Sequence, residues 1–360
     1  MKVLVVATAL GPVGSGRGGG VELTLAGLVA GLLQRGHQLT VLAAAGSRLP
    51  EACAGAALWT CQGTPQLSVQ HQGREASLTM PADGLLGRLW RRVLAEAPQA
   101  GFEVVLNLGY DWLPFWLTPT AALPIFHLVS MGSVTAAMDA VIAEVALWDQ
   151  RRLAFHTASQ AADFQLPGPP RLVGNGFDLN AYGFCAEPEP LLGWVGRVAP
   201  EKGLEDAAAA AARCGLPLAV WGLVEDQPYA DAVQASVPPG TLQWRGFLPT
   251  AQLQAELGRC QALLNTPKWN EAYGNVVVEA MACGVPVVAY RRGGPGELVQ
   301  PGLNGWLVAP DDVEALALAS QQAPALDRRA CRQWVEQNAS QAVLAERLET
   351  WLLEGLAAPR

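Results

Sequence analysis

The sequence lacks the features that mark several large classes of proteins. Charged residues make up only 16% of the 360 residues, and 32 acids against 24 bases give a formal net charge of −8. Proteins that bind nucleic-acid backbones normally carry an excess of positive charge, so nucleic acid is not an expected partner. No apolar run approaches the roughly 18–20 residues of a membrane-spanning helix, so no integral membrane contact is expected.

Patterns of cysteine, histidine and paired aspartate that would bind a metal are also missing. The seven cysteines are scattered, odd in number and free of any C-x-x-C motif, which favours free thiols and a cytoplasmic location. The four histidines have no metal-ligand spacing. A D-x-D motif, which would hold a divalent metal against a diphosphate, does not occur. We therefore expect neither a metal nor a cofactor.

The sequence instead predicts alternating strands and helices in each of two halves. Apolar residues make up 51% of the chain, and the length suggests two domains. Strands and helices are expected over 3–6, 21–35, 38–42, 85–96, 104–107 and 125–128 in the first half. In the second half they are expected over 191–195, 203–214, 218–221, 242–244, 251–259, 262–264, 275–283 and 285–289, before a helical tail over 327–356. This alternation predicts two Rossmann-like domains with parallel sheets facing a cleft.

A proline-rich stretch over 167–190 separates the halves. Prolines at this density exclude a helix interior or a central strand, which predicts a linker. The expected boundaries are a first domain over 1–168, a linker over 169–190, a second domain over 191–335, and a C-terminal helix over 336–360 that packs back toward the first domain.

A glycine-rich loop follows the first expected strand. Gly14, Gly16 and Gly19 satisfy the G-x-G-x-x-G pattern of dinucleotide-binding proteins. However, the loop lies several residues beyond the strand, and the second strand ends in alanines without the acid that would bind a ribose hydroxyl. An NAD-dependent oxidoreductase is therefore the weaker interpretation. The alternatives are a flexible loop before a helix and a loop whose amides approach a substrate.

Two motifs in the second half point more specifically to a phosphate and sugar ligand. Gly196–Gly203 follows an expected strand and carries Arg197 and Lys202, two cations that can neutralise a pyrophosphate. Glu271 precedes an expected helix and Glu279 lies within it, on either side of the positively polarised helix start. Carboxylates there can accept hydrogen bonds from sugar hydroxyls. Surface salt bridges and solvated glutamates are the alternative interpretations.

These motifs resemble a known family. The pattern G-R-x-x-x-E-K-G from Gly196, followed by P-x-x-x-E-A-Y-G-N-x-x-x-E-A-M-A-C-G-x-P-V-V-A from Pro267, is similar to the retaining glycosyltransferases of family four, which have the GT-B fold. The resemblance covers nearly the whole chain. It implies transfer of a hexose from a nucleotide diphosphate sugar, with retention and without a metal. An inactive nucleotide-sugar-binding module, a GT-B epimerase, and an enzyme with a lipid or polysaccharide-precursor acceptor stay open as alternatives.

Four segments carry a narrower resemblance within that family. Gly14–Glu22, Tyr110–Phe115, His127–Ser133 and Thr266–Trp269 are similar to the cyanobacterial UDP-glucose:tetrahydrobiopterin glucosyltransferases. This implies UDP-glucose as the donor and tetrahydrobiopterin, a pterin, as the acceptor.

The resemblance also implies roles for individual residues. Arg197 and Lys202 would hold the donor diphosphate, Glu271 the sugar hydroxyls, and Glu279 the ribose. Together with His127, which would orient or polarise the acceptor, Arg197, Lys202 and Glu271 form the expected catalytic set. The other implied donor contacts are Gly18, Gly19, Gly246, Phe247, Leu248, Ala272, Tyr273, Gly274, Asn275 and Val276. The expected acceptor-binding residues are Asp111, Trp112, His127 and Met131, while direct donor contact from Lys268 is not expected.

Overall fold

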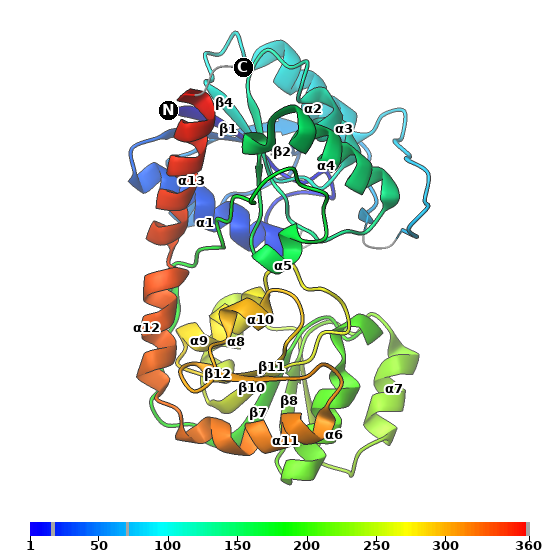
Figure 1. Cartoon of the computed structure of the whole chain (residues 1–360), viewed down its shortest axis with the longest axis vertical. Helices are drawn as coiled ribbons and strands as arrows, with labels where there is room; N and C mark the ends of the chain where they lie inside the picture. The colour runs from blue at the N-terminus through cyan, green and yellow to red at the C-terminus, as the bar shows by residue number, and fades with distance from the viewer. Residues whose placement is uncertain (16–18, 70–71, 358–360) are drawn as a thin grey trace. The chain divides into compact units, whose positions relative to one another are not determined.

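Two compact units, each with its own parallel sheet, make up the chain (Figure 1). The computed structural model describes residues 1–15, 19–69 and 72–357. The first unit comprises Met1–Phe177 and the C-terminal segment from Gln341, and the second comprises Asp178–Ser340. Both sheets have six strands, which confirms the predicted α/β fold class.

The first unit has the strand order β3-β2-β1-β4-β5-β6, with all pairs parallel. Its strands are β1 (Lys2–Val6), β2 (Gln38–Ala44), β3 (Ala57–Cys61), β4 (Val104–Asn107), β5 (Ile125–Leu128) and β6 (Leu153–Ala154). Its helices are α1 (Gly20–Gln34), α2 (Leu85–Glu96), α3 (Trp112–Leu117), α4 (Ala136–Asp149), α5 (Ala158–Ala161) and α13 (Gln341–Ala357).

Helices cover both faces of this sheet, which explains why β1 is apolar from Val3 to Val6. Val3 and Val5 pack on one face with residues of α1 and α13, whereas Leu4 and Val6 pack on the other with residues of α2. Successive side chains of a strand point to opposite faces, so a strand buried on both sides is a continuous apolar run.

The C-terminal helix α13 packs directly on α1. A Cβ atom added to Gly31 of α1 would lie 2.9 Å from the Cβ of Ala345, so the absence of a side chain permits this close approach. At the start of α13, the amide of Gln341 donates a 3.0 Å hydrogen bond to the carbonyl of Phe177. The last residue before the second unit is thus bonded to the first residue after it.

The second unit repeats the same topology, with the order β12-β11-β10-β7-β8-β9. Its strands are β7 (Glu189–Val195), β8 (Leu218–Trp221), β9 (Leu242–Gly246), β10 (Cys260–Asn265), β11 (Val287–Tyr290) and β12 (Gly305–Val308). Its helices are α6 (Leu204–Cys214), α7 (Gln227–Ala235), α8 (Thr250–Leu257), α9 (Asn275–Ala282), α10 (Pro295–Leu298), α11 (Val313–Gln322) and α12 (Arg328–Asn338).

One local expectation was wrong. Pro190 lies inside β7, a central strand, because the β7–β10 register shifts between Cys260 and Ala262 and places the proline at this irregularity. The helical tail expected over 327–356 is confirmed, and it consists of the two helices α12 and α13, since Ala339 leaves the helical region with φ −139° and ψ 22° before α13 begins.

Candidate functional site

The candidate site in the second unit lies at the carboxyl ends of β7 and β10. Strand order reverses between these neighbours, and ligands of open α/β sheets bind at such a reversal. The loop after β7 carries Arg197 and ends in a short 3₁₀ helix, Pro200–Lys202, that carries Lys202. The loop after β10 carries Glu271, just before α9. The structure therefore brings together two segments that lie far apart in the sequence.

Lys202 and Glu271 form an ion pair at this point. The Nζ atom of Lys202 lies 2.7 Å from Oε2 of Glu271, with each side chain about one-fifth exposed. Trp269 fixes the pair from one side, because its Nε1 donates to the same Oε2 atom over 3.0 Å and its ring lies 4.7 Å from the ammonium. The cation is thus held in position by a carboxylate and an aromatic face.

Arg197 is also paired with acids. Its Nη2 atom donates to Oε1 of Glu201 over 2.9 Å, and its Nη1 atom donates to Glu225. The guanidinium is partly exposed, so its charge remains accessible to an anion.

Glycine allows the two loops to meet. Gly203 has φ 66°, and a Cβ atom on it would lie 2.0 Å from the carbonyl oxygen of Thr266. The hydroxyl of Thr266 donates to the Gly203 carbonyl over 2.7 Å, and the amide of Lys268 donates to the Glu201 carbonyl over 2.9 Å. Because any side chain at Gly203 would collide with this junction, the spacing between the cations and Glu271 depends on that residue.

The start of α9 supplies backbone amides to the same site. Gly274 caps the helix with φ 94°, and Ala272, Tyr273, Asn275 and Val276 flank it. The amide of Gly294 donates to the carbonyl of Glu271 over 2.7 Å, which holds the loop before the helix. The amino end of α9 is partially positive and favours an anion.

Glu279, one turn further along α9, is buried. The hydroxyl of Tyr182 donates to its Oε1 atom over 3.3 Å. Burial raises the pKa of Glu279 to about 7, against a hydrogen bond from Tyr182 that lowers it. Tyr182 was not predicted from the sequence, because no local pattern links a tyrosine within the proline-rich stretch to a glutamate 97 positions away.

The loops after β7, β8 and β9 lie side by side. The amides of Gly196 and Gly222 donate to the carbonyls of Trp221 and Gly246 over 3.0 and 2.9 Å. Phe247, which follows Gly246, is 65% exposed, while Leu248 is partly buried. An exposed aromatic ring on the edge that carries Arg197 is suited to stacking on a planar base.

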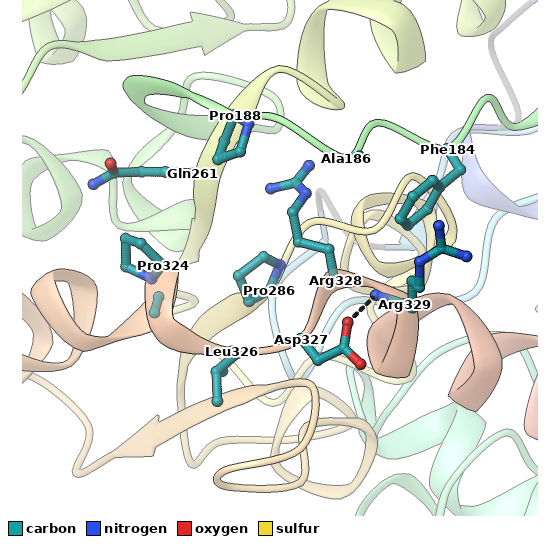
Figure 2. Close-up of a pocket in the computed structure, with 11 residues that line it drawn as sticks. Phe184, Ala186, Pro188, Gln261, Pro286, Pro324, Leu326, Asp327, Arg328 and Arg329 are labelled. Carbon is teal, nitrogen blue, oxygen red and sulfur yellow. Dashed lines mark hydrogen bonds between the residues drawn. The ribbon is translucent and has the colours of Figure 1, made fainter.

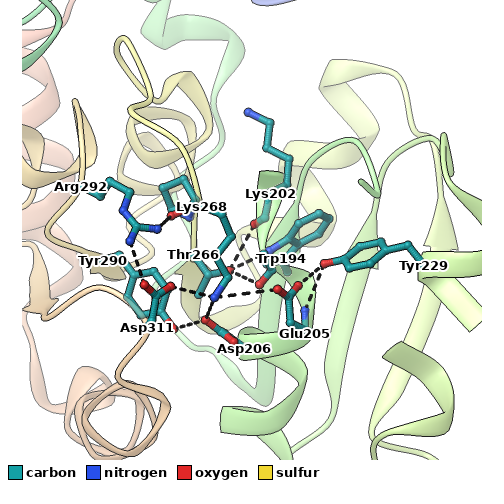
Figure 3. A network of polar contacts seen from close by, with 12 residues as sticks. Trp194, Lys202, Glu205, Asp206, Tyr229, Thr266, Lys268, Tyr290, Arg292 and Asp311 are labelled. Atoms are coloured by element: carbon teal, nitrogen blue, oxygen red, sulfur yellow. Dashed lines mark hydrogen bonds and ion pairs between the residues drawn. The ribbon is translucent and has the colours of Figure 1, made fainter. Parts of the chain in front are cut away.

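A polar network that was not predicted from the sequence surrounds Lys268, beside the loop that carries Lys202 (Figure 3). Lys268 pairs with Asp206 and, over 2.8 Å, with Asp311. Arg292 donates to the other oxygen of Asp311 over 2.9 Å. Hydrogen bonds from both cations hold the pKa of Asp311 below its usual value. Lys268 is thus occupied in joining the loop after β10 to the start of α6.

In the first unit, His127 is enclosed in the core. Its Nδ1 atom accepts from Nδ2 of Asn107 over 3.0 Å, so Nε2 carries the proton and donates to the Thr118 hydroxyl over 2.7 Å. Its ring stacks on Phe115 with centroids 4.0 Å apart. Burial and the charge of Arg152 lower the pKa of His127 to about 3. This environment favours a neutral histidine that supports α3 over one that contacts an acceptor.

Among the other predicted first-unit residues, Trp112 and Met131 pack against the same core cluster. Asp111 occupies the N-cap position of α3 without a side-chain capping hydrogen bond, and it lines a cavity with Trp112. Met131 packs at the edge of a core cluster, and its carbonyl accepts from Gln160 over 2.9 Å. Gly19 precedes α1 with φ 55° and nothing within 4 Å of an added Cβ atom. Gly18 lies outside the described residues.

The second unit contains a further cavity of about 240 Å³, near the amino ends of β7 and β11 (Figure 2). None of the predicted site residues is among the described residues that line it. Its buried guanidinium, Arg328, donates to the carbonyls of Cys185, Gly258 and Cys260 over 2.6–2.9 Å. Arg328 is therefore committed to joining the backbone segments around it.

Neither a metal centre nor a membrane span is found in the part of the chain that the structure describes. There, no group of three or more histidine, cysteine or acidic side chains is arranged to hold a metal ion. The described helices are too short or too polar to cross a bilayer.

The second half of the chain is similar in sequence to a known family. Residues 184–353 match the sequence model of the glycosyl transferases group 1 family. The 2-deoxystreptamine N-acetyl-D-glucosaminyltransferase of Streptomyces fradiae is 37% identical over 142 residues, which are 37% of this chain and 34% of that protein. Glycogen synthase of Mycobacterium tuberculosis is 36% identical over 160 residues, 41% of this chain and 38% of that protein. The chain thus matches only about a third of the length of these curated relatives.

Solved structures with the same architecture cover nearly the whole chain. A glycosyltransferase involved in avilamycin A biosynthesis has a TM-score of 0.73 and 21% identity, covering 99% of both chains. Anabaena HepE in complex with UDP and glucose has a TM-score of 0.73 and 20% identity, covering 98% of this chain and 100% of that one. The fold is therefore that of the GT-B glycosyltransferases.

Proposed function

We propose that this protein transfers a hexose from a nucleotide diphosphate sugar to a small acceptor, with retention of anomeric configuration and without a metal. The observation that carries the proposal is the position of Arg197, Lys202 and Glu271 at the strand-order reversal beside the start of α9. The match of residues 184–353 to the glycosyl transferases group 1 family supports it. UDP-glucose is the proposed donor, and the Anabaena neighbour solved with UDP and glucose supports this choice.

Different residues of the donor site bind different parts of the nucleotide sugar. Arg197 and Lys202 bind the diphosphate with the amides at the start of α9, and Glu271 accepts hydrogen bonds from the sugar hydroxyls. Glu279 binds the ribose, and the segment from Gly246 to Leu248 frames the base. Lys202 already forms an ion pair with Glu271. When a sugar diphosphate binds, Lys202 additionally contacts the diphosphate and Glu271 additionally contacts the sugar hydroxyls.

The chemistry assigned to these groups is electrostatic. Negative charge grows on the leaving diphosphate as the glycosidic bond breaks, and fixed positive groups stabilise it. A well-placed group of this kind is worth roughly 3–4 kcal/mol. The acceptor hydroxyl attacks from the same face that the diphosphate leaves, with a phosphate oxygen taking its proton, so the configuration is retained without a carboxylate nucleophile.

For the acceptor we propose a pterin, tetrahydrobiopterin, bound by the first unit. Asp111 and Trp112 supply a carboxylate and a flat ring at one cavity. His127 acts as a positioning residue, since it packs under α3 through Thr118 and Phe115. Met131 supports the neighbouring segment.

The test is UDP release from UDP-glucose in EDTA, with and without reduced tetrahydrobiopterin. Release that depends on the pterin is expected, and Lys202→Met should lower its rate at least about a hundredfold because one stabilising cation is lost. Arg259→Gln, which removes an exposed cation paired with Glu189 in the same unit, is the matched control and should be unaffected. Activity that disappears in EDTA and returns with Mn²⁺ contradicts the metal-independent mechanism. Absence of release from any nucleotide sugar contradicts the transferase.

A further inference from the structure

The ammonium of Lys268 is surrounded by acidic side chains from two other segments of the second unit (Figure 3). It donates to Oδ2 of Asp206, in the first turn of α6, and to Oδ1 of Asp311, in the loop after β12, over 2.8 Å in the second case. Oε1 of Glu205, the neighbour of Asp206, lies 3.8 Å from the same nitrogen. Oxygen atoms of several carboxylates around one point are typical of a bound cation. Here that cation belongs to the chain itself.

Asp311 has an unusual backbone conformation in this cluster. Among the described residues it is the one non-glycine residue in the left-handed region, with φ 68°. Such a conformation costs energy in a residue with a side chain, and it persists where the surrounding contacts fix it. The contacts are hydrogen bonds from Lys268 and Arg292 over 2.8 and 2.9 Å, which also hold the pKa of Asp311 below its usual value. The loop after β12 is therefore held in place through this carboxylate.

Asp206 depends on the same ammonium. Among the described residues, Lys268 forms the only ion pair of Asp206, whose side chain is 13% exposed. The other contact of its Oδ2 atom is the hydroxyl of Tyr290, which donates to it. Removal of one partner of a largely buried ion pair leaves an uncompensated charge, which is strongly unfavourable. Without the ammonium, Asp206 and Asp311 would also repel each other. Loss of the Lys268 charge should therefore move these segments apart.

Lys268 also contacts or adjoins both partners of the ion pair described above. Its Cε atom would lie 3.3 Å from a Cβ atom added to Gly203, the residue after Lys202. On the other side, Trp269 directly follows Lys268, and its indole donates to Oε2 of Glu271 over 3.0 Å. The same Oε2 atom lies 2.7 Å from Nζ of Lys202. A displacement of Lys268 would therefore change the position of Glu271 relative to Lys202.

We propose that Lys268 is a positioning residue for the proposed transfer, and that its ammonium, by neutralising Asp206 and Asp311, holds the loop of Glu271 against the loop of Lys202. Lys268 does not touch the donor in this proposal and acts through the Lys202–Glu271 ion pair. A free alkylammonium ion of the same length should therefore replace it. The proposal rests on the proposed function for the word transfer, whereas the dependence of the ion pair on Lys268 is a property of the chain alone.

The test is chemical rescue of Lys268→Ala, measured in the full chain without a nucleotide sugar. This substitution removes the side chain beyond Cβ, and n-propylammonium supplies the missing carbons and ammonium. The readout is hydrogen exchange of the Trp269 indole N–H, assigned with Trp269→Phe, because that N–H donates to Glu271. Exchange should be at least about tenfold faster in Lys268→Ala than in the wild type, and n-propylammonium should restore the slower rate. 1-Propanol, which has the same shape without the charge, should not restore it.

Three further variants complete this experiment. Lys268→Arg keeps a positive charge and should keep most of the protection from exchange, whereas Lys268→Met keeps the length without the charge and should exchange as fast as Lys268→Ala. Lys2→Ala is the matched control, because it removes a lysine of the first unit that donates to the carbonyl of Ala100 over 2.6 Å. An exchange rate that does not depend on Lys268 overturns the proposal. Equal rescue by 1-propanol, or no rescue by either n-propylammonium or Lys268→Arg, also overturns it.

Calorimetric binding of UDP separates positioning from loss of folded protein. Lys268→Met should weaken UDP binding at least about tenfold with unchanged stoichiometry, because the diphosphate meets a displaced Lys202. A lower stoichiometry with an unchanged Kd means that part of the protein is unfolded and overturns the proposal. The two proposals also fail separately. Pterin-dependent UDP release by the wild type, with indole exchange that does not depend on Lys268, overturns the positioning role alone. Rescue of that exchange by n-propylammonium, without UDP release from any nucleotide sugar, overturns the transferase alone.

Discussion

Replacing Asp111 with asparagine should change the pH dependence of stability in a way that the structure predicts. The carboxyl has an ordinary pKa of 3.8 in the unfolded chain and a pKa of about 7 when folded, because burial disfavours its charged form. Between these values the folded protein binds more protons than the unfolded one. Its contribution to stability is therefore full at low pH and is lost as the pH rises toward 7.

The size of this effect follows from the two pKa values. At 1.36 kcal/mol per pKa unit, the whole loss is about 4 kcal/mol, of which about 2–3 kcal/mol falls between pH 5 and pH 8. Asparagine has nearly the same shape and does not titrate. Its buried amide carries its own cost of about 1–3 kcal/mol, but that cost does not vary with pH. The free energy of unfolding of Asp111→Asn, relative to that of the wild type, should thus rise by about 2–3 kcal/mol between pH 5 and pH 8.

Scanning calorimetry at pH 5, 6, 7 and 8 measures this gain. For a unit of this size it corresponds to a relative rise in Tm of roughly 4–12 °C. The buried Glu279 titrates in both proteins and cancels in the comparison, and Glu144→Gln controls for the loss of an exposed carboxylate. A difference in Tm that is the same at pH 5 and pH 8 would refute the reasoning, because it would mean that Asp111 is not desolvated in the folded protein.

Three further substitutions test other parts of the structure. Gly203→Ala should lower stability by about 2–3 kcal/mol more than the control Gly240→Ala. Gly240 has φ 86° and nothing within 4 Å of an added Cβ atom, so only the substitution at Gly203 combines backbone strain with a collision. Equal losses of Tm in the two variants contradict this prediction. Tyr182→Phe removes the hydrogen bond that lowers the pKa of Glu279, so the pKa measured by carboxyl NMR should rise, and an unchanged value rules the contact out. His127→Ala should lower stability by about 2–4 kcal/mol because it leaves a cavity beside a stacked ring. An unchanged Tm with lost turnover would instead support the catalytic role predicted from the sequence.

The sequence predicted the regular elements well where the apolar pattern was continuous. The strands over 104–107 and 125–128 and the helix over 85–96 were predicted with the bounds that the structure has. The short edge strand β6 and the helix α3 were not predicted, because two to six residues are too few for a period to emerge. The longer helices α4, α7 and α11 were not predicted either. Pro190 was wrongly excluded from a central strand, because the energetic cost of a proline in a strand depends on where the hydrogen-bond register shifts. The position of that shift depends on the neighbouring strand and cannot be recognised in the sequence of one strand.

The candidate site was predictable only where its residues are close in sequence or belong to a known motif. Lys202 and Glu271 were both singled out, but the pair they form depends on the strand-order reversal that brings β7 beside β10. The network around Lys268 joins residues from four separate segments, so no spacing could indicate it. The burial of His127 could not be predicted from the sequence, because its two hydrogen bonds come from tertiary packing.

The second unit is inserted in the sequence of the first, and a hydrogen bond between Phe177 and Gln341 joins the two ends of the first unit at the insertion point. The chain leaves and re-enters the first unit at adjacent backbone positions, so the first unit is discontinuous in sequence while the second is one uninterrupted stretch. Modules arranged in this way can be exchanged as cassettes, because the host needs only a short turn to reconnect its two ends. A different α/β unit could therefore be grafted at this junction, leaving the core of the first unit and its helix α13 intact.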